Sequence, residues 1–147
     1  MRLIIATACA VLMAAPMAIA DEAENYIKYR QAVMKAIGGH MGASSQIVRG
    51  KVSPEGALGM HADALARLNA DLASLFPEGS DFGETKARAE IWDDWPAFET
   101  KANEARDATA AFAKAVNTGD DDAIRTAQRA VGKSCKGCHK DYRIKDD

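Results

Sequence analysis

The sequence is short of the residues that build disulfide scaffolds, β-sheets and nucleic-acid surfaces. It has 147 residues, with only three cysteines, four prolines and 6% aromatic residues. Three cysteines are too few for a disulfide framework. Its 19 Lys and Arg residues against 21 Asp and Glu residues leave no basic stripe, so nucleic acid is not an expected partner. Runs of β-branched residues are also missing, and the apolar residues instead recur at helical spacing.

Only the N-terminus carries a long apolar run. Met1-Arg2 is followed by an almost wholly apolar stretch from Leu3 to Met17, and Ala18-Ile19-Ala20 precedes the acidic pair Asp21-Glu22. This pattern predicts a secretory signal peptide over residues 1–20, too short and too soon followed by acids to be a membrane span. Nothing after it is apolar enough for membrane insertion, so we expect export to a bacterial periplasm.

Residues 21–147 are therefore expected to form one mature domain. Losing Arg2 leaves 18 of the 19 basic residues against 21 acidic ones, a net charge of −3. Cys9 would leave with the signal, so the mature chain would keep only Cys135 and Cys138. A single domain of this length can bury a substantial core.

Those two cysteines stand in the pentad Cys135-Lys136-Gly137-Cys138-His139. The pattern C-x-x-C-H is the attachment motif for c-type haem, in which two thiols form thioethers with the porphyrin vinyl groups. Histidine is a common axial ligand of haem iron. The motif predicts one covalent haem c, with His139 as iron ligand.

Three other interpretations of the motif stay open at this point. A redox dithiol would use the same C-x-x-C spacing, but it is expected near the start of a βαβ unit, and no strands are predicted. Half of a zinc site is a second option, although a closed site needs a fourth ligand. A disulfide between two cysteines three apart would strain a helix and constrain little.

The mature sequence predicts an all-α fold, an antiparallel four-helix bundle with covalently bound haem. Its helices are expected at Glu22 to Val48, Ser53 to Pro77, Ala89 to Asn117 and Asp120 to Tyr142. Ser53 would cap the second helix with Pro54 at its first position. Pro96 would kink the third helix or split off its first turns. Residues 78–86 would form a polar loop.

This arrangement resembles the class II c-type cytochromes, the cytochrome c′ family. The segments that carry the likeness are Lys28 to Lys35, Lys86 to Asp93 and Val131 to Arg143, with the haem motif at the end of the last helix. The resemblance spans essentially all of the mature chain. It implies residue roles around the haem: attachment by Cys135 and Cys138, iron ligation by His139, contact near the propionates by Arg30 and Gln31, and bordering positions for Glu84, Thr85 and Arg143.

The resemblance also places Met34 on the far side of the iron. In this family an apolar residue there usually keeps the iron five-coordinate and high-spin, whereas some relatives use methionine as the sixth ligand. Met34 lies one helical turn after Arg30, on the same face. We expect Met34 to bind the iron, with a methionine that merely fills the space above the haem as the other possibility.

Two functions follow from these alternatives. The first is a periplasmic carrier of single electrons, with iron held by His139 and Met34 and with redox proteins as partners. The alternative is a five-coordinate high-spin protein that binds nitric oxide or carbon monoxide at an open distal site. An enzyme such as a peroxidase is not expected, because no histidine stands beside Arg30 to serve as a distal acid or base.

Four further expectations concern other features of the chain. Lys133, Lys136 and Lys140 could form a positive rim for an acidic partner. Trp92 and Trp95 are expected in the core, and His40 and His61 in solvent. A homodimer through the first two helices is possible.

Overall fold

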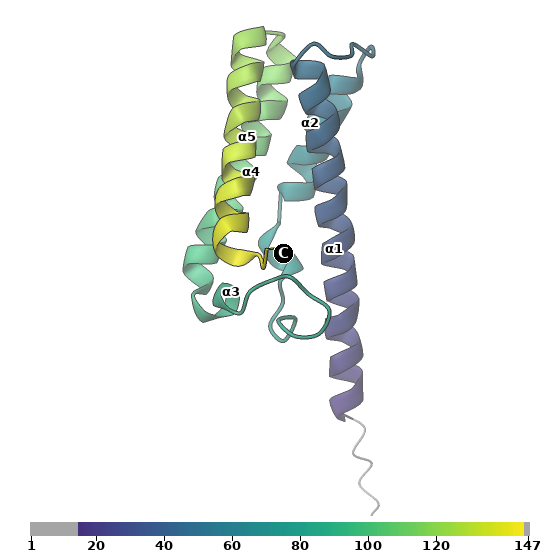
Figure 1. Ribbon diagram of the computed structural model, residues 1–147, viewed down its shortest axis with the longest axis vertical. Helices are drawn as coiled ribbons and strands as arrows, with labels where there is room; N and C mark the ends of the chain where they lie inside the picture. The colour runs from purple at the N-terminus through teal and green to yellow at the C-terminus, as the bar shows by residue number, and fades with distance from the viewer. Residues whose placement is uncertain (1–14, 146–147) are drawn as a thin grey trace, which may run out of the picture.

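A computed structural model describes residues 15–145, with side chains from residue 21 onward. Its elements are α1 (Ala15–Val48), α2 (Ala57–Asn69), the 3-10 turn η1 (Ala73–Leu75), α3 (Glu90–Asp93), α4 (Trp95–Thr118) and α5 (Asp121–Tyr142). The four long helices form the all-α bundle that the sequence predicted (Figure 1). α4 packs against both α5 and α2, and α1 packs mainly against α2. α1 and α5 make few contacts with each other.

One helix start differs from the sequence prediction. α1 is already helical at Ala15, the first described residue, so the predicted start at Glu22 lies inside it. Residues 1–14 of the predicted signal peptide lie outside the described residues, so its cleavage stays a prediction. α2 begins at Ala57 rather than after Ser53, because Gly56 has a left-handed backbone (φ +68°) that a helix cannot include.

The predicted second helix is also shorter than expected. α2 ends at Asn69, whose buried side-chain amide donates a hydrogen bond to the Leu65 carbonyl at 2.8 Å. Such side-chain bonds compete with the backbone ladder and favour a helix end. The chain then continues through η1, so Leu75 reaches the core from this 3-10 turn rather than from α2.

Pro96 divides the predicted third helix, as expected. Asp94 has non-helical backbone angles (φ −133°, ψ 68°), and its side chain accepts a hydrogen bond from the Ala97 N–H at 3.2 Å. A proline within the first helical turn has no N–H to satisfy, so it fits there and nowhere deeper. The residues before the break form α3, a single turn.

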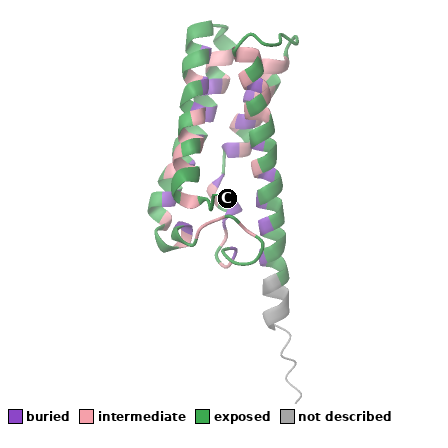
Figure 2. Ribbon diagram, in the orientation of Figure 1, coloured by how far each residue is buried: buried purple, intermediate pink, exposed green. Residues whose placement is uncertain are grey.

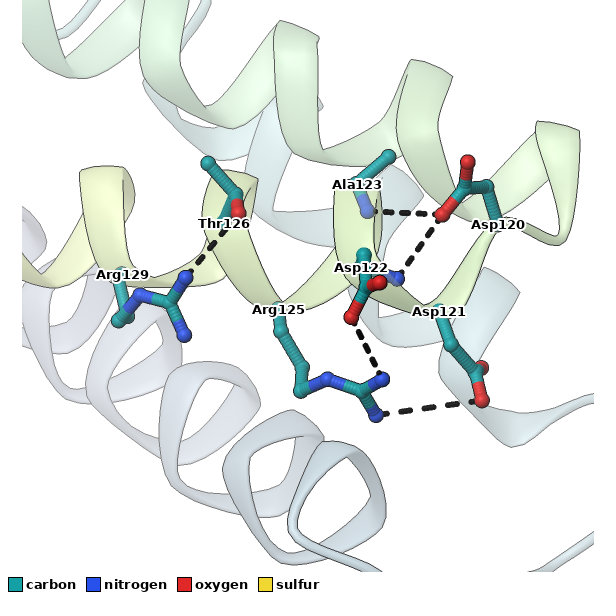
Figure 3. Close-up of polar contacts among 7 residues, drawn as sticks. All are labelled: Asp120, Asp121, Asp122, Ala123, Arg125, Thr126 and Arg129. Atoms are coloured by element: carbon teal, nitrogen blue, oxygen red, sulfur yellow. Dashed lines mark hydrogen bonds and ion pairs between the residues drawn. The ribbon is translucent and has the colours of Figure 1, made fainter.

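The start of the last helix follows the prediction closely (Figure 3). Gly119 ends α4 in a left-handed conformation (φ +71°). Asp120 then caps α5, because its carboxylate accepts hydrogen bonds from the N–H groups of Asp122 at 2.9 Å and Ala123 at 3.0 Å. Acidic residues are favoured there by the positive end of the helix dipole.

The core runs along the inner faces of the four long helices (Figure 2). Its fully buried large apolar side chains are Leu65, Ile91, Phe98, Phe112 and Val131. The predicted inner side of α5 is confirmed, since Val131 is buried and the cysteines of the motif pack against the core. No helix within residues 15–145 is long and apolar enough to cross a membrane.

Candidate functional site

The haem-attachment motif occupies the last turns of α5. Cys135 and Cys138 are both half-buried free thiols, so no disulfide joins them. Burial, and then the neighbouring Cys135, raise the pKa of Cys138 to about 11. Burial also raises the pKa of Cys135. Both thiols are therefore protonated at neutral pH, unlike the low-pKa cysteines of redox dithiols, which sit at helix N-termini.

The zinc interpretation also loses support in the structure. Within residues 15–145, no cluster of three or more His, Cys, Asp or Glu side chains is arranged to hold a metal ion. A structural zinc site needs four such ligands, deprotonated where they are thiols. The described residues therefore supply no complete zinc site at the motif.

A cavity of about 500 Å³ opens beside the motif. It lies between α1 on one side and the end of α5 on the other, with the 76–87 segment, α3 and α4 completing its wall. The predicted site residues that line it are Arg30, Gln31, Met34, Thr85, Cys138, His139 and Arg143. Cys135 and Glu84 are not among its lining residues.

The lining of this cavity suits a flat apolar ring that carries acids. Met34, Phe76, Ile91 and Phe98 give apolar walls, and the charged lining residues are Arg30, Lys35, Lys86 and Arg143, without a carboxylate. An anionic group therefore meets only positive charge at the edge. Its volume lies in the usual range for small-molecule sites, roughly 300–1,000 Å³. A haem, with its apolar macrocycle and two propionates, fits this set.

Gly38 adds to the room on the α1 side. It lines the cavity, and a Cβ placed on it would meet no protein atom within 4 Å. The glycine therefore leaves space that no other side chain of the protein fills.

Arg30 is buried at the cavity wall, with 3% of its surface exposed. Its guanidinium donates to the Leu75 carbonyl at 3.2 Å, the Ser80 hydroxyl at 2.9 Å, the Ser80 carbonyl at 2.9 Å and the Thr85 hydroxyl at 2.9 Å. It also lies over the Phe76 ring, 4.7 Å from its centroid. Burial lowers the pKa of Arg30 from its very high ordinary value. Arg30 thus fixes the 75–85 segment against α1.

Three more hydrogen bonds hold this segment and the residues that follow it in place. Next to Arg30, the Gln31 amide donates to the Glu84 carbonyl at 2.6 Å, so Glu84 contributes its backbone rather than its side chain. At the other end, Arg88 N–H donates to the Tyr142 carbonyl at 3.1 Å and Ile144 N–H to the Lys86 carbonyl at 2.8 Å. The end of α5 is therefore tied to the loop that closes the cavity.

Aromatic rings form the base of the site. The Phe98 ring lies 4.7 Å from Phe76, 5.3 Å from Tyr142 and 5.4 Å from Trp95, measured between centroids. Trp92 packs against the same core, and its indole N–H donates to the Phe76 carbonyl at 3.2 Å. The expectation that both tryptophans serve packing is confirmed.

Sequence reasoning missed the parts that Phe76 and Ser80 play. Phe76 follows η1, outside any regular helical pattern, and Ser80 is a buried residue of the predicted polar loop. A serine and a glycine in a loop normally indicate a turn, so no local signal pointed to Ser80 as the partner of Arg30.

His139 lines the cavity at the end of α5 and is exposed on its outer side. Desolvation at the cavity, together with the positive charge of Arg143, lowers the pKa of His139. A neutral imidazole keeps a lone pair free, which is the form that binds a metal. Lys133, Lys136 and Lys140 are exposed around the motif.

The expectation that His40 and His61 face solvent is wrong. Both are half-buried, and their rings meet between α1 and α2.

Comparison with known proteins agrees with this geometry. The protein-family model described as Cytochrome C′ matches residues 25–143 of this chain. The cytochrome c′ of Pararhodospirillum photometricum is 37% identical over 121 residues, which cover 82% of this chain and 97% of that protein. The cytochrome c prime structure from Shewanella frigidimarina superposes with a TM-score of 0.79 at 35% identity, covering 84% of this chain and 97% of that one.

Two similar structures hold gases. A nitric oxide complex of a cytochrome c prime variant from Alcaligenes xylosoxidans has a TM-score of 0.78 at 33% identity, covering 84% of this chain and 97% of that one. A carbon monoxide complex of another variant from the same organism has a TM-score of 0.77 at 33% identity, with the same coverage. The four-helix fold, the haem motif and these matches together show that the chain belongs to the cytochrome c′ family, whose members are non-enzymatic proteins with one covalent haem c.

Proposed function

We propose that this protein is a haem-based binder of diatomic gases, nitric oxide or carbon monoxide. The observation that carries the proposal is the close likeness to cytochrome c prime structures that hold these two gases. Among the two functions expected from the sequence, this supports gas binding over the six-coordinate electron carrier. When bound, the haem supplies an iron that takes up a gas molecule and that changes between the ferric and ferrous states.

In this proposal Cys135 and Cys138 hold the haem through thioethers. Each thiol adds across one vinyl C=C bond: the sulfur bonds to one carbon and the thiol proton goes to the other, so no oxidant is needed. The raised pKa values of both thiols agree with cysteines that are not themselves reactive thiolates at neutral pH. Enzymatic attachment would supply the activation that the chain lacks.

His139 would be the residue that holds the iron, with Arg143 near it. The lowered pKa of His139 keeps its imidazole neutral, which favours metal binding. On the α1 side, the Met34 side chain lines the cavity and is half-buried against the core. A flexible thioether there would narrow the space that a ligand could enter on this side.

The positive edge of the cavity receives the haem acids. The Arg30 guanidinium already donates its hydrogen bonds to the 75–85 segment. Arg30 would therefore act chiefly by holding this segment at the cavity and by its positive charge. The exposed Gln31 and Lys35 and the part-buried Thr85 stand at the same edge. Glu84, held through its carbonyl by Gln31, borders the site without lining it.

Electron transfer remains the second candidate, because Met34 and His139 line the same cavity from facing helices. If the Met34 sulfur reached the iron, histidine and methionine together would raise the reduction potential and suit a carrier. Exposed Lys133, Lys136 and Lys140 would then face an acidic redox partner.

Absorption spectra of the purified protein decide between the two functions. We expect a high-spin ferric spectrum, uptake of carbon monoxide by the ferrous protein, and no change of spin state in Met34→Leu. Met60→Leu is the matched control, since Met60 is 53% exposed on α2 and does not line the cavity. A low-spin ferric spectrum that turns high-spin in Met34→Leu alone would establish methionine ligation and the carrier function instead.

Location and assembly complete the proposal. Cytochromes c′ are typically periplasmic proteins, and a signal peptide over residues 1–20 would take this chain there. N-terminal sequencing of protein from the periplasmic fraction checks it, with Asp21 as the expected first residue. The homodimer through α1 and α2 stays a prediction, to be tested by light scattering.

A further inference from the structure

Two histidines outside the haem site face one another across the α1–α2 interface. The Nδ1 atoms of His40, on α1, and His61, on α2, are 2.9 Å apart. Their ring centroids are separated by 5.2 Å, with an angle of 61° between the ring planes. Both residues are half-buried, so the pair is neither sealed in the core nor freely mobile in solvent.

The haem function does not use this pair. The chain has three histidines, and the third, His139, belongs to the haem motif. Neither His40 nor His61 lines the haem cavity. At 2.9 Å one imidazole donates a hydrogen bond from its Nδ1 to the Nδ1 of the other, and the two rings meet nearly head-on.

We propose that His40 and His61 form a binding site for one divalent late transition-metal ion, Cu²⁺ or Ni²⁺. Binding of the ion would break the hydrogen bond between the two rings. Imidazole is a preferred ligand of both ions, and neutral histidine is the commonest protein ligand for metals.

The separation of the nitrogens favours these ions over zinc. Two nitrogens about 2.0–2.1 Å from a metal and at right angles to each other lie about 2.9 Å apart, whereas a tetrahedral angle would place them about 3.3 Å apart. The observed 2.9 Å matches the right angle of square-planar or octahedral coordination. Because the two rings now meet nearly head-on, both would have to turn about their side-chain torsions before the two nitrogens could face one ion.

Water would complete the coordination. Within residues 15–145, no third His, Cys, Asp or Glu joins this pair to make a larger metal cluster. The site is therefore a two-nitrogen chelate that joins α1 to α2, open to solvent on its exposed side. Because the chelate forms only when the two helices are packed together, metal binding would stabilise the folded bundle.

Titration of the tag-free ferric holoprotein with Cu²⁺ after treatment with a chelator tests the proposal. We expect one Cu²⁺ per chain by calorimetry, nitrogen hyperfine structure from two imidazoles in the Cu²⁺ EPR spectrum, and a higher thermal midpoint with Cu²⁺ present. His40→Gln or His61→Gln should each lower the affinity at least about tenfold, since even an outer-shell partner of a metal ligand is worth about 10- to 100-fold.

Asp63→Asn is the matched control, because Asp63 is an exposed carboxylate on α2 two residues after His61. It should leave Cu²⁺ affinity unchanged, and all variants should keep the haem spectrum of the wild type. Wild-type affinity no higher than that of the double variant His40→Gln/His61→Gln would overturn the proposal. An EPR spectrum that shows a single nitrogen, or that persists in both single variants, would do the same.

Discussion

Arg30 offers the sharpest test of how the haem cavity is held together. It is a buried cation with 3% exposure, and all four of its hydrogen bonds go to uncharged oxygen atoms of the 75–85 segment. Arg30→Ala would leave the carbonyls of Leu75 and Ser80 without their buried donor. Each orphaned group costs about 1–3 kcal/mol, giving a sum of about 2–6 kcal/mol.

Two effects reduce that sum. Water can enter from the adjoining cavity and satisfy part of the loss, and the folded protein no longer bears the cost of burying a guanidinium. We therefore expect Arg30→Ala to lower the free energy of unfolding by about 2–4 kcal/mol. In a domain of this size that is a fall in Tm of about 6–20 °C.

Thermal and urea denaturation of the ferric holoprotein, followed by circular dichroism, measure this change. Arg129→Ala is the matched control, because Arg129 is an exposed arginine whose guanidinium bonds only to the Thr126 hydroxyl of its own helix, at 3.1 Å (Figure 3). The control should leave the transition almost where it is. If Arg30→Ala unfolded at the same temperature as Arg129→Ala, the bonds to the 75–85 segment would not stabilise the protein.

Three further substitutions test neighbouring parts of the account. Thr85→Val removes one acceptor of Arg30 and the acceptor of the Ala87 N–H, so it should lower the free energy of unfolding by about 1–3 kcal/mol. The loss should be smaller in a protein that already carries Arg30→Ala, which a double-mutant cycle would measure. Phe98→Ala removes a ring that is 1% exposed and packs against three other aromatic rings. Urea denaturation should show that the free energy of unfolding falls by about 3–5 kcal/mol. A fall of less than about 1 kcal/mol would contradict the packing described for the base of the site. Asp120→Ala removes the cap of α5 and should cost about 1 kcal/mol in the same assay, whereas Asp120→Asn should retain most of the stability.

The gas-binding proposal and the metal proposal are independent of each other. The first depends on Met34 and His139 at one cavity, and the second on His40 and His61 at a different interface. A carrier-type spectrum would refute the first without touching the second. Failure of Cu²⁺ to bind would likewise leave the haem function as it stands.

Local sequence patterns were informative wherever a single residue fixes the backbone. Pro96 split the third helix because proline offers no N–H to a helix interior, and Asp120 with Gly119 marked the junction of the last two helices. The prediction failed at the start of α2, where Ser53-Pro54 offered a good cap but the left-handed Gly56 delayed the helix to Ala57. Two local signals competed there, and their order along the chain did not show which one would prevail.

The sequence by itself determined the haem motif, the four-helix pattern and the family, because these depend on covalent spacing and on apolar periodicity within single helices. Only the tertiary structure decided which residues share a site: it brought Arg30 to Ser80, over a separation of 50 residues, and joined His40 to His61 between two helices. Such contacts depend on how helices are rotated against each other and on the path of an irregular loop. Neither leaves a periodic trace in the sequence, so packing alone sets them.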